Sequence, residues 1–194
     1  VNIANLETGY WRTAVVAAGR LKERFYQQAG MKVPDGLVEV DNSQFQAEED
    51  SDFSPPAIPE YYDSIVTKYS NLLGIAKELI EIPELFVHLD SLIQSPFTPQ
   101  NCEAGSTNPT CFVSTLYKKV FNVHVNARAI RFMADSTIDF IKKESLAIGD
   151  LVYFKTNSKF KAFDQVGIYL YNNRIAYVSQ NQILISNLNQ DPKL

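Results

Sequence analysis

The sequence GDLVYFKTNSKFKAFDQVGIYLYNNRIAYVSQNQILIS, residues 149–186, carries the densest strand pattern in the chain. Short runs of β-branched and aromatic residues alternate there with turn residues. The expected strands are residues 151–154, 166–170, 175–179 and 183–185. The turns between them contain Asn157-Ser158, Asn172-Asn173 and Asn181. This spacing predicts an antiparallel meander of hairpins.

The part of the chain that precedes this meander has mainly helical patterns. Apolar residues recur at steps of three and four over residues 5–29, which predicts one amphipathic helix that stops at Gly30. The same periodicity predicts helices over residues 59–81, 83–93, 111–121 and 126–133, and a short segment over 137–143 leads into the sheet. Helices followed by a small antiparallel sheet indicate the α+β class.

An acidic segment separates the first two predicted helices. Residues 33–67 contain nine acidic residues, no Lys or Arg, and prolines at positions 34, 55, 56 and 59. We interpret residues 33–58 as an acidic loop that serves as a solvated connector, in preference to a lid or a cation site. The loop lacks the alternating oxygen ligands and central glycine of a calcium loop, so we expect no metal site and no cofactor.

Composition limits the classes of function. The chain has 194 residues, of which 45% are hydrophobic and 21% charged, and its net charge is −4. No basic cluster indicates nucleic-acid binding, and no apolar run has the length of a membrane span. Cys102 and Cys111 are the two cysteines. They either close a small disulfide loop in an oxidising compartment or remain free thiols.

The meander resembles the NlpC/P60 family of papain-like cysteine peptidases. The family motifs GDLVFF, HVGIYLG and FIHAS, and a short strand that ends in Ser or Thr, have counterparts in this chain. These are GDLVYF (149–154), QVGIYLY (165–171), IAYVS (175–179) and ILIS (183–186). The resemblance implies a papain-like core over residues 96–194, in which a small antiparallel sheet packs on helices. Residues 1–95 would then form a mainly helical N-terminal region.

The catalytic positions depart from the family pattern. The run NPTCFVSTLYKK (108–119) aligns without a gap on the family's DCSGFVxYxYKK, which places Pro109 at the nucleophilic cysteine. Gln165 stands at the histidine that acts as general base, and Tyr177 stands where the family often has a second histidine. Proline has no nucleophile, and the glutamine amide does not titrate near neutral pH.

A gapped alignment leaves Cys111 itself as the nucleophile. It would lie two residues further along the helix, rotated by about 200° from the family position. Its base would be His124, His88 or a residue that the pattern does not identify. His88 lies among apolar residues of its predicted helix, where a lone histidine is more often a core residue than a ligand.

Three interpretations follow. The resemblance favours a non-catalytic NlpC/P60-like module of the bacterial cell envelope, periplasmic or extracellular, that binds cell-wall peptide or a protein partner in a scaffolding or regulatory role. The alternative is an active cysteine peptidase or amidase that cleaves peptidoglycan peptides with Cys111. A third interpretation drops the resemblance: the chain is then an α+β soluble protein with a helical N-terminal half and a small antiparallel sheet, and it acts through its acidic loop or helix faces.

Overall fold

The computed structural model describes residues 15–34, 60–93, 108–126, 135–155 and 163–188. One six-stranded antiparallel sheet has the order β2-β1-β3-β4-β5-β6. Its strands are β1 Val15–Leu21, β2 Ile138–Ile141, β3 Leu151–Phe154, β4 Gln165–Tyr169, β5 Arg174–Ser179 and β6 Gln182–Asn187. The helices are α2 Glu23–Gln28, α3 Glu60–Leu73, α4 Pro83–Ile93 and α5 Asn108–Phe121, with short 3₁₀ turns at Lys77–Leu79 and Lys143–Ser145. The α+β class is confirmed.

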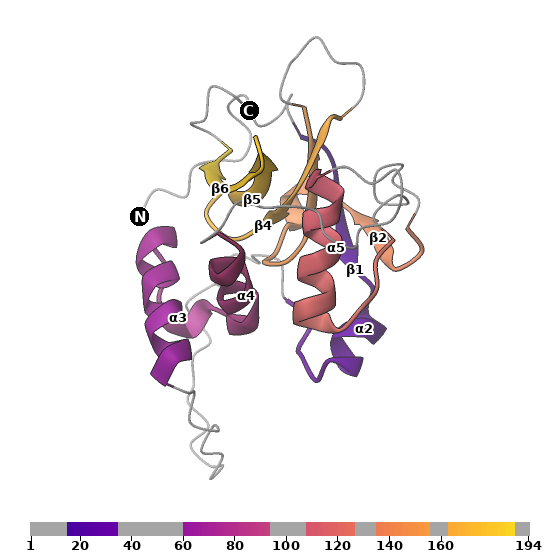
Figure 1. The fold of residues 1–194 in the computed structure, drawn as a ribbon. Coiled ribbons are helices and arrows are strands. Elements are labelled where there is room, and N and C mark those ends of the chain that lie inside the picture. Colours follow the sequence, from indigo (N-terminus) through magenta and orange to yellow (C-terminus); the bar gives the residue numbers. More distant parts are fainter. Residues whose placement is uncertain (1–14, 35–59, 94–107, 127–134, 156–162, 189–194) are drawn as a thin grey trace.

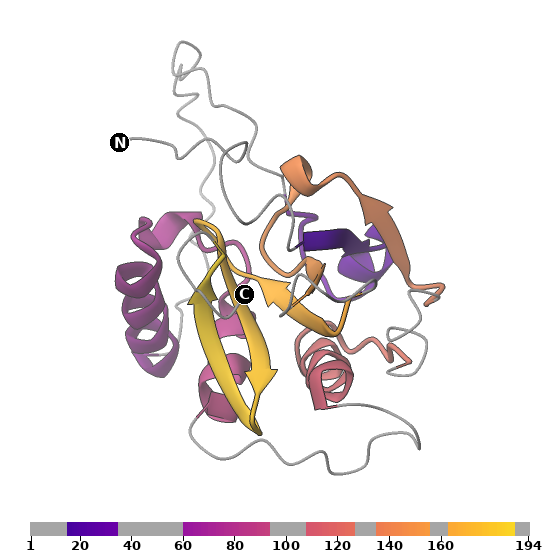
Figure 2. The ribbon, with the colours of Figure 1, turned by 90° about the horizontal axis from the view of Figure 1, so that it is seen from above.

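The helices lie side by side in the order α3, α4, α5 (Figures 1 and 2). The main apolar core joins their inner faces to the sheet. A second, smaller cluster lies on the other face, and its members are Val15, Ala18, Leu146, Val152, Phe154, Tyr169, Ile175, Tyr177 and Leu188. Strand residues alternate between the two clusters because successive side chains of a strand point to opposite faces.

The predicted meander is confirmed in β3 to β6. Strand β3 has the expected bounds, and the other three strands differ from the prediction by one or two residues at their ends. Asn172 and Asn173 have φ of 48° and 58°, and Gln180 and Asn181 have φ of 50° and 61°. Turns with two successive positive φ values match the twist of the flanking strands, and asparagine tolerates that conformation well.

The predicted helix over residues 5–29 is wrong for its central part. Residues 15–21 form strand β1, which pairs with β2 on one side and β3 on the other. Only α2 retains the predicted helix, and residues 5–14 lie outside the described residues. The run VVAAGRL begins with two β-branched residues, which favour a strand. Pairing with two neighbouring strands outweighs the helical spacing of its apolar residues. A Cβ atom on Gly19 would lie 2.6 Å from Cγ2 of Ile138, so glycine permits the close approach of β2.

Strand β1 crosses the expected division between residues 1–95 and 96–194, since it lies between two strands of the second part. The helical content expected of the first part is present in α3 and α4. The predicted helix over 59–81 ends at Leu73 because Gly74 has a φ of 68°. The helix over 83–93 is confirmed as α4, and β2 lies within the segment predicted at 137–143. Residues 35–58 of the acidic loop, and residues 127–133 of a predicted helix, lie outside the described residues.

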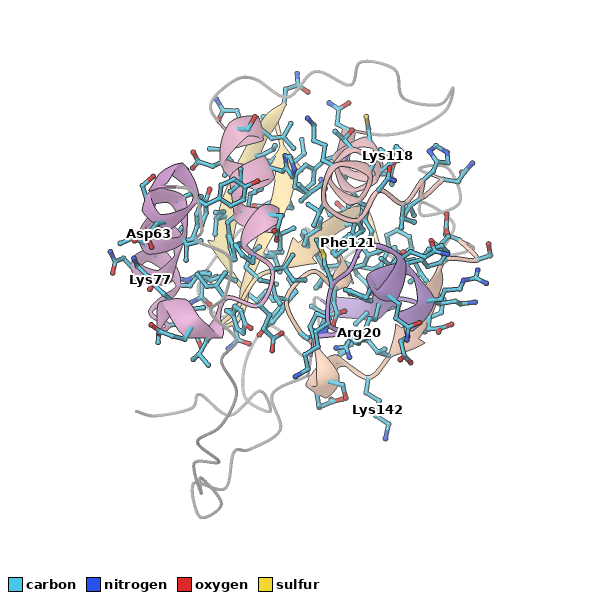
Figure 3. The ribbon with its side chains drawn as sticks, turned by 90° about the horizontal axis from the view of Figure 1, so that it is seen from below. Arg20, Asp63, Lys77, Lys118, Phe121 and Lys142 are labelled. Atoms are coloured by element: carbon cyan, nitrogen blue, oxygen red, sulfur yellow. The ribbon has the colours of Figure 1, made fainter. Side chains whose placement is uncertain are left out.

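Hydrogen bonds from the β4–β5 turn connect α3 to the sheet. The Asn172 side-chain amide donates to the Leu73 carbonyl at 2.7 Å, and the Arg174 guanidinium donates to the Leu72 carbonyl. The Tyr171 hydroxyl donates to the Leu79 carbonyl at 2.7 Å. Carbonyls at a helix C-terminus have no partner within the helix, so these side chains satisfy acceptors that the helix leaves open. An ion pair between Lys77 and Asp63, 2.9 Å long, joins the following 3₁₀ turn to α3 (Figure 3).

A buried ion pair joins β1 to the turn that enters β3. Asp150 is fully buried, and its two carboxylate oxygens accept from Nε and Nη2 of Arg20, each at 2.8 Å. The Ala147 amide also donates to Asp150, at 2.7 Å, and Arg20 donates to the Ser145 carbonyl at 2.6 Å. Burial raises the pKa of the Asp150 carboxyl, while the hydrogen bonds from Arg20 and Ala147 oppose that rise. Arg20 is labelled in Figure 3.

Replacing Arg20 by alanine should lower the free energy of unfolding by roughly 3–5 kcal/mol, because Asp150 then stays buried without its counter-ion. Chemical denaturation followed by circular dichroism measures this loss. Lys22→Ala is the matched control, since Lys22 pairs with Asp139 at 3.6 Å on the surface. Its effect should stay within about 1 kcal/mol. Equal effects of the two substitutions would show that the buried pair does not stabilise the fold.

Candidate functional site

Three chain segments meet at one end of the sheet: the start of α5, the start of β4 and the end of β5. The Asn108 amide, in the first residue of α5, donates to Oδ1 of Asn181 at 2.5 Å. Asn181 belongs to the turn that follows β5. The register pairs Gly167 with Tyr177, and continuing it places Gln165 beside Ser179. The helix start and the first residue of β4 therefore both lie next to the β5–β6 turn.

Gln165 and Tyr177 lie together on one face of the sheet. Gln165 pairs with Phe154 of β3, and directly opposite residues of an antiparallel pair point to the same face. The rings of Phe154 and Tyr177 meet edge to face, with centroids 5.4 Å apart. Residues at diagonal positions of adjacent strands, such as Gln165 and Tyr177, are about 7–8 Å apart. The structure thus brings two of the three predicted catalytic positions together.

The Tyr177 side chain and one atom of the Gln165 side chain are buried. Tyr177 is 3% exposed and belongs to the smaller apolar cluster. Oε1 of Gln165 is buried and has no hydrogen-bond partner among the described residues. An amide at this position can accept a hydrogen bond but cannot take up a proton near neutral pH.

Pro109 lies in the first turn of α5, the helix that packs on the other face of the sheet. Apolar residues of α5 belong to the main core, together with Val166 and Ile168 of β4. Pro109 is the second residue of α5, where the missing N–H removes no helical hydrogen bond. The structure therefore places Pro109 in the first turn of α5, and its own side chain has no group that can attack a carbonyl.

Cys111 is disulfide-bonded, and its residue is 1% exposed. The chain has one other cysteine, Cys102, which lies outside the described residues. Of the two alternatives for the cysteines, the disulfide is confirmed for Cys111. A sulfur in a disulfide carries no thiolate, and the thiolate is the form that attacks a substrate.

The two histidines lie away from β4 and β5. His88 is on α4, where desolvation by burial lowers its pKa, Lys119 lowers it further and Glu84 raises it. His124 is exposed and follows the end of α5 at Phe121. Because 14 helical residues span about 21 Å, His124 lies at the opposite end of the helix from Cys111.

A buried polar cluster that the sequence did not predict consists of Tyr26, Tyr117 and the Arg20–Asp150 ion pair. The Tyr117 hydroxyl of α5 donates to the Gly149 carbonyl at 2.5 Å, one residue before Asp150. Tyr26 of α2 is fully buried, and its hydroxyl has no hydrogen-bond partner among the described residues. Burial raises the pKa of both phenols, Tyr26 and Tyr117. Arginine inside the apolar run VVAAGRL was the one sequence signal for this cluster.

Within the described ranges, no three side chains of His, Cys, Asp or Glu gather in a way that would hold a metal ion. In the same ranges no helix has both the length and the apolar character that crossing a bilayer requires.

Comparison with known proteins finds a match in the C-terminal part of the chain. The model of the NlpC/P60 family matches residues 104–193. No curated protein and no solved structure matches the chain. The matched residues contain α5 and β2 to β6, and they leave out β1, α3 and α4.

The position of His88 predicts a pH dependence of stability. Its pKa lies below the ordinary 6.5, so the unfolded chain binds more protons than the folded chain as pH falls below 6.5. Stability contributed by neutral His88 is present above pH 6.5 and is lost progressively as the pH falls below 6.5. Thermal unfolding of wild type and His88→Gln across this range should show a smaller loss in the variant. A His88→Gln curve parallel to wild type would contradict the assignment.

Proposed function

Because residues 104–193 form an NlpC/P60 domain, which indicates a peptidoglycan-related role, we propose that this chain is a pseudoenzyme of the cell envelope. It binds cell-wall peptide or a protein partner and serves a scaffolding or regulatory function. The observation that carries the proposal is the pair Gln165 and Tyr177, which occupies the positions of the base and its orienting group. A papain-like reaction needs a group there that accepts the thiol proton and returns it.

The state of the nucleophile position supports the same proposal. In the ungapped alignment the position holds Pro109, which has no reactive side chain. The nearest sulfur, that of Cys111, is buried and bonded to another sulfur. Two separate requirements of the reaction, a thiolate and a base, are therefore not met by Pro109, Cys111 and Gln165.

The alternative, an active peptidase or amidase that uses Cys111, requires more than reduction of the disulfide. The freed thiol would still need a base. His124 lies at the far end of α5, and His88 lies on α4, where burial disfavours its charged form. Neither histidine lies on the strands that carry the base in the family pattern.

The disulfide of Cys111 also supports a periplasmic or extracellular location. Disulfides persist in oxidising compartments and are rare where thiol reductants are abundant. Such a compartment is where cell-wall peptides are exposed to a binding protein.

A site without proton-transfer groups can still bind. The start of α5 is held to the β5–β6 turn by the bond between Asn108 and Asn181. Gln165 is half-buried, and its side-chain amide can both donate and accept hydrogen bonds. These features supply shape and hydrogen-bonding groups at the end of the sheet. Binding of a ligand needs both of these, and it needs no proton transfer.

The test is incubation of the chain with defined muropeptides under oxidising and reducing conditions, followed by mass spectrometry. We expect no cleavage product in either condition, because reduction restores a thiol but not a base. Titration of the same muropeptides, followed by nuclear magnetic resonance, distinguishes the two kinds of ligand: saturable shifts identify cell-wall peptide, and unchanged spectra point to a protein partner.

Two cysteine variants provide the matched controls. Cys102→Ala leaves Cys111 without its only possible partner within the chain, whereas Cys111→Ala removes the sulfur at the start of α5. Both should be inactive. Cleavage by the reduced wild type and by Cys102→Ala, but not by Cys111→Ala, would establish the alternative and overturn the pseudoenzyme proposal.

A further inference from the structure

Strand β6 forms one edge of the sheet, and β2 forms the opposite edge (Figure 2). Among the described residues β6 pairs with β5 alone. Its sequence QILISN has no charged residue, no proline and no glycine. The Leu184 side chain is 38% exposed. An edge strand of this composition has backbone groups and apolar side chains that a further strand can cover.

The opposite edge has the features that normally prevent strand pairing. Strand β2 contains Asp139, and Lys142 and Lys143 follow it directly. Asp139 also forms an ion pair with Lys22 of the neighbouring segment. Charged side chains along an edge disfavour addition of another strand because pairing would desolvate them or bring like charges together. The protection is therefore present at one edge of this sheet and absent at the other.

The register of the β5–β6 hairpin shows which backbone groups face outward. Ser179 pairs with Gln182 across a two-residue loop. Residues that flank such a loop form a hydrogen-bonded pair, and this orientation alternates along the strand. Gln182, Leu184 and Ser186 therefore direct their N–H and C=O groups toward β5. The backbone groups of Ile183 and Ile185 point to the outer edge.

We propose that β6 pairs with β6 of a second copy of this chain, in antiparallel orientation about a two-fold axis at Leu184. In this register Leu184 faces its own copy, and Ile183 faces Ile185 of the second copy. The outward backbone groups of Ile183 and Ile185 then form hydrogen-bonded pairs, and Leu184 occupies the closer, non-hydrogen-bonded position. The two six-stranded sheets become one continuous sheet.

A second copy fits this edge because the strand is complementary to itself. A two-fold interface brings the same surface of both copies together, so any charged residue near the axis would face a like charge. Strand β6 has none, and the axis at Leu184 matches leucine with leucine and isoleucine with isoleucine. The paired region is short, so we expect a weak, concentration-dependent dimer.

Sedimentation velocity from micromolar to near-millimolar concentration tests the proposal. Wild type should pass from monomer to dimer, and Leu184→Lys should raise the dissociation constant roughly tenfold or more, since it places like charges opposite each other. Leu72→Lys is the matched control, because Leu72 is 42% exposed and lies on α3 and not on the strand that pairs. It should dimerise as wild type does. A monomeric wild type, or equal effects of the two variants, would overturn the proposal.

A cross-linking experiment tests the register. The Cα atoms of a non-hydrogen-bonded pair are about 4.5 Å apart, which lies within the range that a disulfide spans. Leu184→Cys should therefore form a covalent dimer under mild oxidation, visible on a non-reducing gel, and Leu72→Cys should not. The native disulfide is left intact by omitting reductant. Failure of Leu184→Cys to cross-link faster than Leu72→Cys would contradict an axis at Leu184.

Discussion

The buried ion pair between Arg20 and Asp150 is the interaction on which the rest of the structure depends. It joins a strand near the start of the described chain to a turn 130 residues later. Burying two charges is unfavourable unless each is fully paired, and here the carboxylate receives three donors from Arg20 and Ala147. Gly149, with a φ of 86°, makes the turn that presents Asp150, and its carbonyl accepts from Tyr117. Strand β1, the entry to β3 and helix α5 thus converge on a few buried polar atoms.

This convergence explains why the region that the NlpC/P60 model matches cannot be separated from β1 and α3. The family match begins at residue 104, yet β1 lies between β2 and β3 of the matched region. Without β1, strand β2 would lose the only neighbour that it has among the described residues. The β4–β5 turn makes a second connection, since it donates hydrogen bonds to carbonyls at the end of α3. The N-terminal residues are therefore structural parts of the sheet and its helical layer.

Local pattern was sufficient for β3 to β6 because their partners are close in sequence and their turns contain asparagine at positions with positive φ. It was insufficient for β1. Val15, Ala18 and Leu21 fit a helical spacing as well as a strand, and the partners that decide the matter lie more than 100 residues away. Gly74 was a visible stop signal inside the predicted helix over 59–81. At the site, motif alignment singled out Gln165 and Tyr177 as candidates, but neither the disulfide of Cys111 nor the burial of Oε1 of Gln165 follows from spacing, because both depend on tertiary geometry.

The contacts that form the frame at this end of the sheet differ in kind from the groups that a papain-like reaction needs. The frame depends on backbone register, on the bond between Asn108 and Asn181 and on the contact between the rings of Phe154 and Tyr177. None of these contacts involves a group that titrates near neutral pH. Catalysis, in contrast, needs a thiolate and a base with a pKa near the working pH. Tyr177 contributes to this frame through its ring, which packs against Phe154. A histidine in place of Tyr177 would exchange this packed aromatic contact for a polar group. That group would have no base to orient, because the Gln165 amide does not titrate near neutral pH.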